Sequence, residues 1–356
     1  MNYGVQVKEY KGQRIGYYGG KFLPFHYGHL DCILKAQSMV DILFVVVGYD
    51  VIHDGKVCES TAFEHVSHRV RERWITKELK GFKNIRVLSQ YERRSNEYMN
   101  DPTIKQSYEE LLNKIGGTID VVFSSEKEYG DYFEKYLPGA KHVVIDENRI
   151  NRPISATKIR KEGVYAHWNN LPKSVQEYYT KRVAICGIES AGKSHIVKML
   201  AKYFDTNYVG EYGRSYYDEI NGFQDISQPS DYLDIAVGHC HLMNEASKKS
   251  NKLLMVDTDL SYTQFFYFLE NERFSKVIDE LIRSKAEGIE KYIYIEPYNF
   301  HELDGTRRHL TNEERNSRNN LLKSIYENYE IDLVIVDEVD RSRRFEKCVE
   351  AIKDLF

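Results

Sequence analysis

The sequence lacks the features that mark secreted, membrane-spanning and nucleic-acid-binding proteins. No apolar run approaches the roughly 18–20 residues that a membrane-spanning helix needs, and no signal peptide opens the chain. The 50 Lys and Arg residues against 54 Asp and Glu residues leave no basic excess, which argues against a dedicated nucleic-acid binder. The five cysteines are dispersed and include no C-x-x-C pair, which favours reduced thiols. We therefore expect a cytoplasmic protein with no membrane insertion and no nucleic-acid partner.

The order of apolar runs and amphipathic stretches predicts two domains, as does the length of 356 residues. The apolar run Ile42–Val47 is typical of a buried parallel strand, and strand and helix signals alternate on both sides of residue 169. This is a doubly wound α/β pattern that occurs twice. We expect domains at 1–168 and 181–356, with 169–180 as a linker or a short capping helix. The expected strands are Arg14–Tyr18, Ile42–Val47, Ile85–Val87, Asp120–Phe123, His142–Ile145, Lys181–Cys186, Leu253–Val256, Tyr292–Ile295 and Leu333–Val336.

The first motif runs from Gly20 to His29 and reads G-K-F-L-P-F-H-Y-G-H. Two imidazoles, His26 and His29, are expected at the start of a helix that follows a strand, where they can donate to the phosphates of a nucleotide. Adenylyl transfer needs such donors, because charge moves onto the departing pyrophosphate. Gly20 and Gly28 permit close backbone approach, and Lys21 supplies a further cation. Phe22 is part of the same ATP-binding set.

A second phosphate-binding element is expected at Ile154–Arg160, which reads I-S-A-T-K-I-R. Ser155 and Thr157 can cap a helix and offer amides and hydroxyls to phosphate oxygens. Arg160 lies one turn further on and can pair with the γ-phosphate.

The third motif, Gly187–Ser194, fits G-x-x-x-x-G-K-[ST] without deviation and stands between a predicted strand and a predicted helix. Its backbone amides are expected to cradle ATP phosphates, Lys193 to reach the β- and γ-phosphates, and Ser194 to bind Mg²⁺. The ATP-binding residues predicted here are Gly187, Ser190, Ala191, Gly192, Lys193, Ser194 and the following His195.

An acidic strand end at Leu253–Asp259 completes this second site. Asp257 or Asp259 would hold Mg²⁺ or accept a hydroxyl proton, and the sequence does not decide which does what. Glu211 could contact an acceptor sugar and Arg214 could neutralise phosphate charge, although a surface ion pair would give the same pattern. Asp304 and Arg307, followed by Arg315, are typical of a lid that closes over a transferring phosphoryl group, or of a solvated charged loop.

The first two motifs resemble the nucleotidyltransferase superfamily that includes nicotinamide-mononucleotide (NMN) adenylyltransferases. That resemblance implies a nucleotide-facing loop at 121–126 and an NMN-binding pair at Arg73 and Trp74, where a core tryptophan is the alternative. An adenylyltransferase followed by a P-loop kinase resembles the bifunctional NadR family. The resemblance implies a Rossmann-like domain and a P-loop kinase domain, both with parallel sheets. Some relatives begin with a helix-turn-helix domain, and fewer than 20 residues precede the first strand here, so repressor function is not expected.

The resemblance to NadR implies an enzyme of NAD salvage that uses Mg²⁺ and ATP. Its kinase half would phosphorylate nicotinamide riboside to NMN, and its first half would convert NMN to NAD. Three alternatives remain open: another adenylyltransferase–kinase fusion acting on a different cofactor precursor, a riboside kinase with a regulatory nucleotide-binding domain, and a non-catalytic nucleotide sensor. Assembly into a homo-oligomer is also left open by the sequence.

Overall fold

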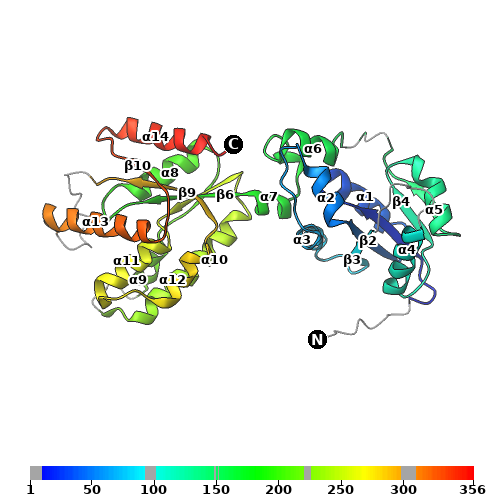
Figure 1. Cartoon of the computed structure of the whole chain (residues 1–356), viewed down its shortest axis with the longest axis horizontal. Helices are drawn as coiled ribbons and strands as arrows, with labels where there is room; N and C mark the ends of the chain where they lie inside the picture. The colour runs from blue at the N-terminus through cyan, green and yellow to red at the C-terminus, as the bar shows by residue number, and fades with distance from the viewer. Residues whose placement is uncertain (1–9, 93–101, 148–149, 151, 220–225, 298–309) are drawn as a thin grey trace. The chain divides into compact units, whose positions relative to one another are not determined.

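Two parallel five-stranded sheets, one in each half of the chain, form the framework of the structure (Figure 1). The computed structural model describes residues 10–92, 102–147, 150, 152–219, 226–297 and 310–356. The chain divides into two compact units, Met1–Tyr178 and Tyr179–Phe356.

The sheet of the first unit has the strand order β3-β2-β1-β4-β5, and all neighbouring strands pair in parallel. Its strands are β1 (Ile15–Gly20), β2 (Ile42–Tyr49), β3 (Ile85–Tyr91), β4 (Val121–Ser124) and β5 (Lys141–Val144). Its helices are α1 (Tyr27–Gln37), α2 (Val51–Cys58), α3 (His68–Glu78), α4 (Pro102–Ile115), η1 (Lys127–Tyr129), α5 (Gly130–Tyr136), α6 (Ala156–Glu162), η2 (Trp168–Asn170) and α7 (Lys173–Tyr179).

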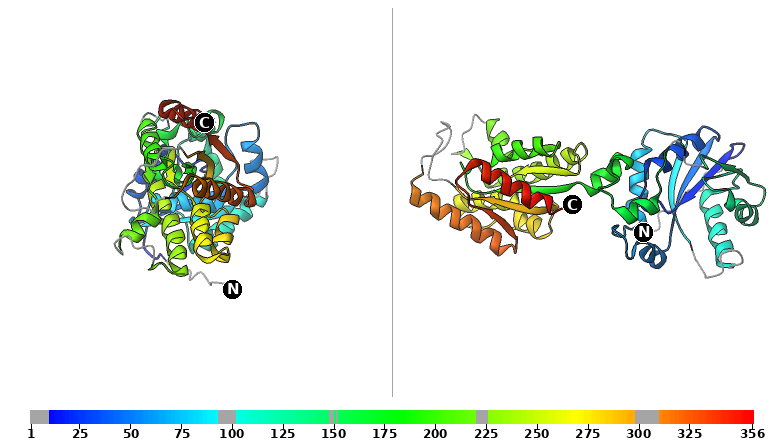
Figure 2. Two further views of the ribbon diagram at one scale, coloured as in Figure 1. Left: turned by 90° about the vertical axis from the view of Figure 1, so that its left-hand side faces the viewer. Right: turned by 90° about the horizontal axis from the view of Figure 1, so that it is seen from above.

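Helices cover both faces of this sheet, which explains the continuous apolar run of β2 (Figure 2). Side chains alternate along a strand, so Phe44 and Val46 pack on one face with Leu111 of α4 and Phe133 of α5. The intervening Val45 is fully buried on the opposite face, where α1 and α3 contact the sheet. Chain order reverses between β1 and β4, the place where open α/β sheets bind ligands at their carboxyl edge.

The second unit has the strand order β10-β9-β6-β8-β7, again with parallel pairing. Its strands are β6 (Lys181–Cys186), β7 (Asn207–Val209), β8 (Leu253–Asp257), β9 (Ile289–Ile295) and β10 (Leu333–Val336). Its helices are α8 (Lys193–Tyr203), α9 (Tyr212–Asp218), α10 (Pro229–Ser247), α11 (Leu260–Asn271), α12 (Lys276–Arg283), α13 (Asn312–Asn328) and α14 (Arg341–Lys353).

The central strand β6 divides the core of this unit into two layers. Val183 and Ile185 pack with residues of α8 and α14, including Leu200 and Cys348. The alternate residues Ala184 and Cys186 pack with residues of α11 and α13. The loop that follows β6 therefore emerges at the centre of the sheet's carboxyl edge.

The segment 169–180, for which we predicted a linker or a short capping helix, contains the end of η2 and the whole of α7. The helix begins after Pro172, and its side chains Val175 and Gln176 are buried. Gln176 Nε2 donates to the carbonyl of Trp168 at 2.8 Å, and the amide of Ser174 donates to Glu78 of α3 at 2.6 Å. Residues 169–178 are thus part of the first unit, and the polar residues Ser174 and Gln176 of α7 are buried there and hydrogen-bonded.

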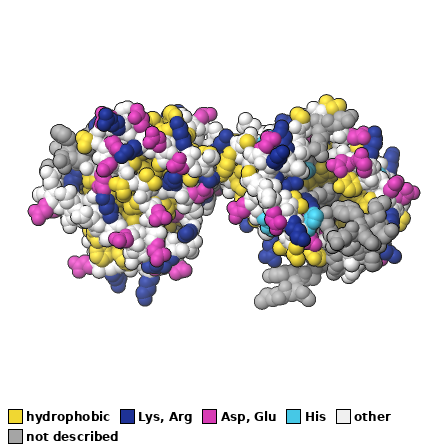
Figure 3. Space-filling view, turned by 45° about the horizontal axis from the view of Figure 1, so that its top comes forward, with side chains coloured by type: hydrophobic (Ala, Val, Ile, Leu, Met, Phe, Trp, Pro, Cys, Tyr) yellow, Lys and Arg dark blue, Asp and Glu magenta, His cyan; other side chains and the backbone are white. Residues whose placement is uncertain are grey.

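Lys and Arg side chains are interspersed with Asp and Glu over the visible face of each unit in Figure 3. Within the described part of the chain, no helix has the length and apolar composition required to cross a membrane.

Candidate functional sites

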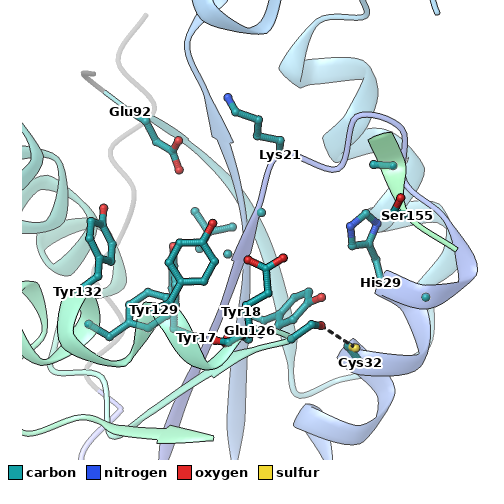
Figure 4. Close-up of a pocket in the computed structure, with 18 of the residues that line it drawn as sticks. Tyr17, Tyr18, Lys21, His29, Cys32, Glu92, Glu126, Tyr129, Tyr132 and Ser155 are labelled. Carbon is teal, nitrogen blue, oxygen red and sulfur yellow. Dashed lines mark hydrogen bonds between the residues drawn. The ribbon is translucent and has the colours of Figure 1, made fainter. Parts of the chain in front are cut away.

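A cavity of about 430 Å³ lies at the carboxyl edge of the first sheet, beside the ends of β1 and β4 (Figure 4). It is lined by most residues of the first two motifs. They are Gly20, Lys21, His26, Gly28 and His29 from the first motif, and Ile154, Ser155, Ala156 and Thr157 from the second. Ser124, Ser125 and Glu126 of the predicted nucleotide-facing loop line it as well. The fold thus joins segments that lie more than a hundred residues apart.

The two histidines stack on each other at the start of α1, with ring centroids 3.8 Å apart. His26 is the N-cap residue, and its Nδ1 accepts a hydrogen bond from the amide of Gly28 at 3.1 Å. A neutral His26 therefore carries its hydrogen on Nε2, where it is a donor. Phe22 is 1% exposed and packs edge-on against His29 with centroids 5.0 Å apart. The ring of Phe22 thus orients His29 and does not line the cavity.

Ser155 is the N-cap of α6, and its hydroxyl accepts from the amide of Lys158 at 3.2 Å. Arg160, expected to meet a γ-phosphate, is directed elsewhere and is not among the cavity residues. Its Nη1 donates to the carbonyl of Leu23 at 2.6 Å and its Nη2 to the hydroxyl of Thr157 at 3.0 Å. In this structure Arg160 braces the loop after β1.

The predicted NMN-binding pair Arg73 and Trp74 is not brought to the cavity. Arg73 is exposed, whereas Trp74 is buried and meets Tyr178 edge-on, with centroids 5.3 Å apart. Helical periodicity explains the difference from the expectation, because the inward face of α3 carries Arg71, Trp74 and Ile75. Arg71, which the sequence did not single out, reaches the first motif: its Nη1 donates to the carbonyl of Lys21 at 2.7 Å.

The far end of the cavity has a different chemistry. Glu92 and Glu126 lie there among the rings of Tyr17, Tyr129 and Tyr132, as Figure 4 shows. Burial raises the pKa of Tyr17, so its hydroxyl stays neutral at physiological pH. Of these residues, only Glu126 belongs to a segment that the sequence analysis singled out, the loop at 121–126. The others come from separate elements that share no motif.

The second site is built around the P-loop after β6. Gly187 has φ of 137°, and a Cβ atom there would lie 2.6 Å from the carbonyl oxygen of Ile295, so only glycine fits. Gly192, with φ of 88°, is the N-cap of α8. Lys193 is buried, donates to the carbonyl of Ile188 at 2.9 Å, and lies 4.6 Å from the ring centre of Tyr262. This arrangement places a cation and a helix N-terminus at one point.

Arginines from two distant helices hold this loop. Arg318 of α13 pairs with Glu189 at 2.9 Å, and Arg344 of α14 donates to the carbonyl of Ala191 at 3.2 Å. Arg315, one turn before Arg318, is only 3% exposed. Its Nη1 and Nη2 have no hydrogen-bond partner among the described residues, and burial lowers its pKa. A buried guanidinium without a partner is costly, which makes it a candidate anion-binding group.

The two aspartates at the end of β8 have different environments. Asp259 is the N-cap of α11: it accepts from the amides of Ser261 and Tyr262 and, at 2.5 Å, from the hydroxyl of Tyr326. Burial raises the pKa of Asp259, and also that of Glu287, on which the negative charge of Asp259 acts in the same direction. Asp257 is 3% exposed, and its Oδ1 has no partner among the described residues. Asp257 thus retains an unpaired buried oxygen, the kind of group that a cation would satisfy.

Comparison with known proteins gives the family. A cytidylyltransferase-like model matches residues 17–162, and an AAA-domain model matches residues 182–344. The chain is 31% identical over 344 residues to the trifunctional NAD biosynthesis/regulator protein NadR of Escherichia coli (strain K12), covering 96% of this chain and 83% of the relative. It is 32% identical over 348 residues to the protein of that name from Salmonella typhimurium, with the same coverage. The chain belongs to the NadR family.

The fold agrees with this assignment. A crystal structure of a NadR protein in complex with NR aligns over 96% of both chains with a TM-score of 0.74 at 22% identity. The prediction of two α/β domains, each with a parallel sheet, is thereby confirmed.

The other residues predicted for the kinase half include one exposed side chain, one ion pair and two residues that the structure does not describe. His195 is exposed on the first turn of α8. Glu211 and Arg214 form an ion pair with a 3.6 Å separation, and Tyr212 between them packs so tightly on Gly238 that a Cβ there would lie 2.2 Å from the ring. The predicted lid residues Asp304 and Arg307 lie outside the described residues.

The contrast between Asp257 and Asp259 gives a first prediction. Asp257→Asn should abolish most riboside phosphorylation without lowering the melting temperature, because it removes the charge of a carboxylate whose Oδ1 has no partner among the described residues. Asp259→Ala should instead destabilise the kinase unit by about 0.5–2 kcal/mol, through loss of a helix cap. Thermal unfolding and an ADP-release assay on both variants test this. Equal loss of stability in the two variants would contradict the assignment.

Proposed function

We propose that this NadR-family chain carries out two consecutive steps of NAD salvage. The second unit phosphorylates nicotinamide riboside with ATP and gives NMN. The first unit transfers AMP from a second ATP to NMN and gives NAD and pyrophosphate. The observation that carries the proposal is the presence, in one NadR-family chain, of two separate phosphate sites of different design: the stacked pair His26 and His29, and the P-loop with Lys193.

In the first unit, adenylyl transfer needs the NMN phosphate oxygen to attack the α-phosphorus of ATP while pyrophosphate departs. No protein nucleophile is required if the two substrates are held in line. His26, with a donor at Nε2, and His29 beside it can stabilise the charge that develops on the phosphates. The N-terminus of α6, capped by Ser155, offers further backbone donors to the triphosphate.

The acidic, aromatic end of the cavity suits the other substrate. The nicotinamide ring of NMN is a pyridinium cation, and cations are attracted both to carboxylates and to the faces of aromatic rings. Glu92, Glu126 and the neighbouring tyrosines supply these groups, whereas the opposite end supplies Lys21 and the histidines for phosphates. A contribution of Arg73 and Trp74 to NMN binding stays a prediction.

In the second unit, the P-loop backbone and Lys193 bind the β- and γ-phosphates, which directs transfer of the γ-phosphoryl group. Ser194 and Asp257 would hold the Mg²⁺ that accompanies ATP, and a bound Mg²⁺ would neutralise charge on the β- and γ-phosphates. The orphaned oxygen of Asp257 fits that role. Arg315 adds a positive charge beside the loop. Glu211, which pairs with Arg214 at 3.6 Å, would contact the acceptor sugar.

The two activities should be separable by single substitutions. His29→Ala should lower NAD formation about 10²–10³-fold, because a donor to the transition state is lost. Riboside phosphorylation should persist, so NMN accumulates.

Lys193→Ala should abolish riboside phosphorylation instead and leave NAD formation intact when NMN is supplied. Chromatography of the products from riboside and Mg·ATP measures both; a folded His29→Ala variant that no longer consumes riboside would refute the assignment of sites to units.

The ratio of products provides a second test. Transfer of a γ-phosphoryl group releases ADP, and adenylyl transfer releases pyrophosphate. Each NAD made from riboside should therefore be accompanied by one ADP and one pyrophosphate, with two ATP consumed. Coupled assays run to completion with limiting riboside measure these amounts. ADP without pyrophosphate would mean that the first unit is a regulatory nucleotide-binding domain.

Arg315 should matter for activity more than for stability. Arg315→Met keeps similar volume and removes an uncompensated buried charge, so the melting temperature should stay constant or rise. Kinase kcat/KM for ATP should fall about 10- to 100-fold, the range expected for losing a hydrogen bond to a charged group. Lys276→Met, which removes an exposed positive charge from α12 of the same unit, is the control for losing a positive charge. A destabilised Arg315→Met variant with normal kinetics would show a purely structural role.

A further inference from the structure

A buried ion triad lies directly behind the first motif and uses three residues from different elements. Asp54 of α2 is 0% exposed and Arg71 of α3 is 1% exposed, although charged side chains are seldom fully buried. Arg71 Nη2 lies 2.7 Å from Asp54 Oδ2. The other carboxylate oxygen, Oδ1, accepts from the ammonium group of Lys21. Asp54 therefore links a buried arginine to a lysine that lines the cavity.

The surroundings show that this triad also fixes the backbone of the loop after β1. Arg71 Nη1 donates to the carbonyl of Lys21 at 2.7 Å, and Arg160 Nη1 donates to the carbonyl of Leu23 at 2.6 Å. Phe22 between these carbonyls has φ of 49°, which is uncommon for a residue other than glycine. Two arginines from α3 and α6 thus brace the strained residue that packs against His29.

The charges of the triad are mutually dependent. Burial by itself would raise the pKa of Asp54, but its hydrogen bonds with Lys21 and Arg71 and their positive charges outweigh burial and lower it. Asp54 is thus ionised at physiological pH. The ammonium group of a lysine is carried on a flexible four-carbon stem, so without a tether it would sample many positions. Here the Asp54 carboxylate limits the positions of the Lys21 ammonium group. Figure 4 shows Lys21 between Glu92 and the pair His29 and Ser155.

We propose that Asp54, held by Arg71, is a positioning residue of adenylyl transfer: it aims the ammonium group of Lys21 at the triphosphate of ATP. Asp54 itself does not touch substrate, because it is fully buried and is not among the residues that line the cavity. The inference rests on the proposed adenylyltransferase activity. Its particular claim is that the effect of Asp54 passes through Lys21.

A double-mutant cycle tests this claim. NAD formation from supplied NMN is measured for the unmodified chain, Lys21→Ala, Asp54→Asn and the double variant, with kcat and KM for ATP determined separately. Asp54→Asn should lower kcat/KM for ATP about 10-fold in the unmodified chain. In the Lys21→Ala background, Asp54→Asn should lower kcat/KM for ATP less than about 2-fold, because the effects of residues that act through one another are not additive. An equal loss in both backgrounds, or no loss in either, would overturn the proposal.

Two controls separate positioning from folding. Glu59→Gln removes the same charge from the exposed end of α2 and should leave kinetics unchanged. Removing Asp54 alone leaves Arg71 buried without a partner and can destabilise the unit, so Asp54→Leu combined with Arg71→Met removes both buried charges. This pair also loses the hydrogen bond from Arg71 to the carbonyl of Lys21, but it leaves no buried charge unpaired, so it should melt closer to the unmodified chain than Asp54→Asn does and still show the loss in kcat/KM for ATP. Full activity in that variant would overturn the proposal.

A binding readout distinguishes failure of this inference from failure of the proposed function. ATP affinity is measured by calorimetry in the Lys193→Ala background, which weakens the kinase site, with and without Asp54→Asn. If the unmodified chain makes no NAD, the proposed function fails. The positioning of Lys21 for ATP by Asp54 is then still decided, because weaker ATP binding by the Asp54→Asn variant supports it and unchanged binding overturns it.

Discussion

Both units depend on holding a short loop open to a polyphosphate at the carboxyl end of a central parallel strand. Such a loop must leave its amides unpaired with the sheet and adopt backbone angles that ordinary residues avoid. In the P-loop, Gly187 and Gly192 have positive φ angles, and Ser190 has φ of 59° without being glycine. In the first motif, Phe22 has a positive φ without being glycine, and the surrounding structure supports it.

The support comes from arginines in both units. Arg71 and Arg160 donate to carbonyls on either side of Phe22, and Arg344 donates to the carbonyl of Ala191 in the P-loop. A guanidinium suits this role because it stays charged when buried and its several donors have fixed directions. The lysines proposed to bind phosphate, Lys21 and Lys193, are other side chains, and each is tethered by a group of the protein.

Charge is also divided within each site. The cavity of the first unit has cationic groups at one end and carboxylates with tyrosines at the other, which matches a nucleotide whose phosphate and pyridinium ring carry opposite charges. In the second unit the neighbouring aspartates differ in a comparable way. Asp259 uses both oxygens to cap α11, and Asp257 keeps one oxygen without a partner among the described residues.

The sequence by itself determined the motifs Gly20–His29 and Gly187–Ser194, their strand–loop–helix context and the parallel α/β class of both units. These are local properties: spacing fixes which residues share a helix start, and apolar runs mark buried strands.

Tertiary structure decided which residues from distant segments are brought together. Helix α2, with β-branched Val51 and Ile52 and with Gly55, gave a weak helical signal, yet it supplies the buried Asp54. The inward face of α3 selected Arg71 over Arg73, because helical periodicity leaves one buried and the other in solvent. Equivalent-looking aspartates at 257 and 259 acquired different environments only when α11 and Tyr326 were packed beside them, since burial and hydrogen-bond partners are set by the fold.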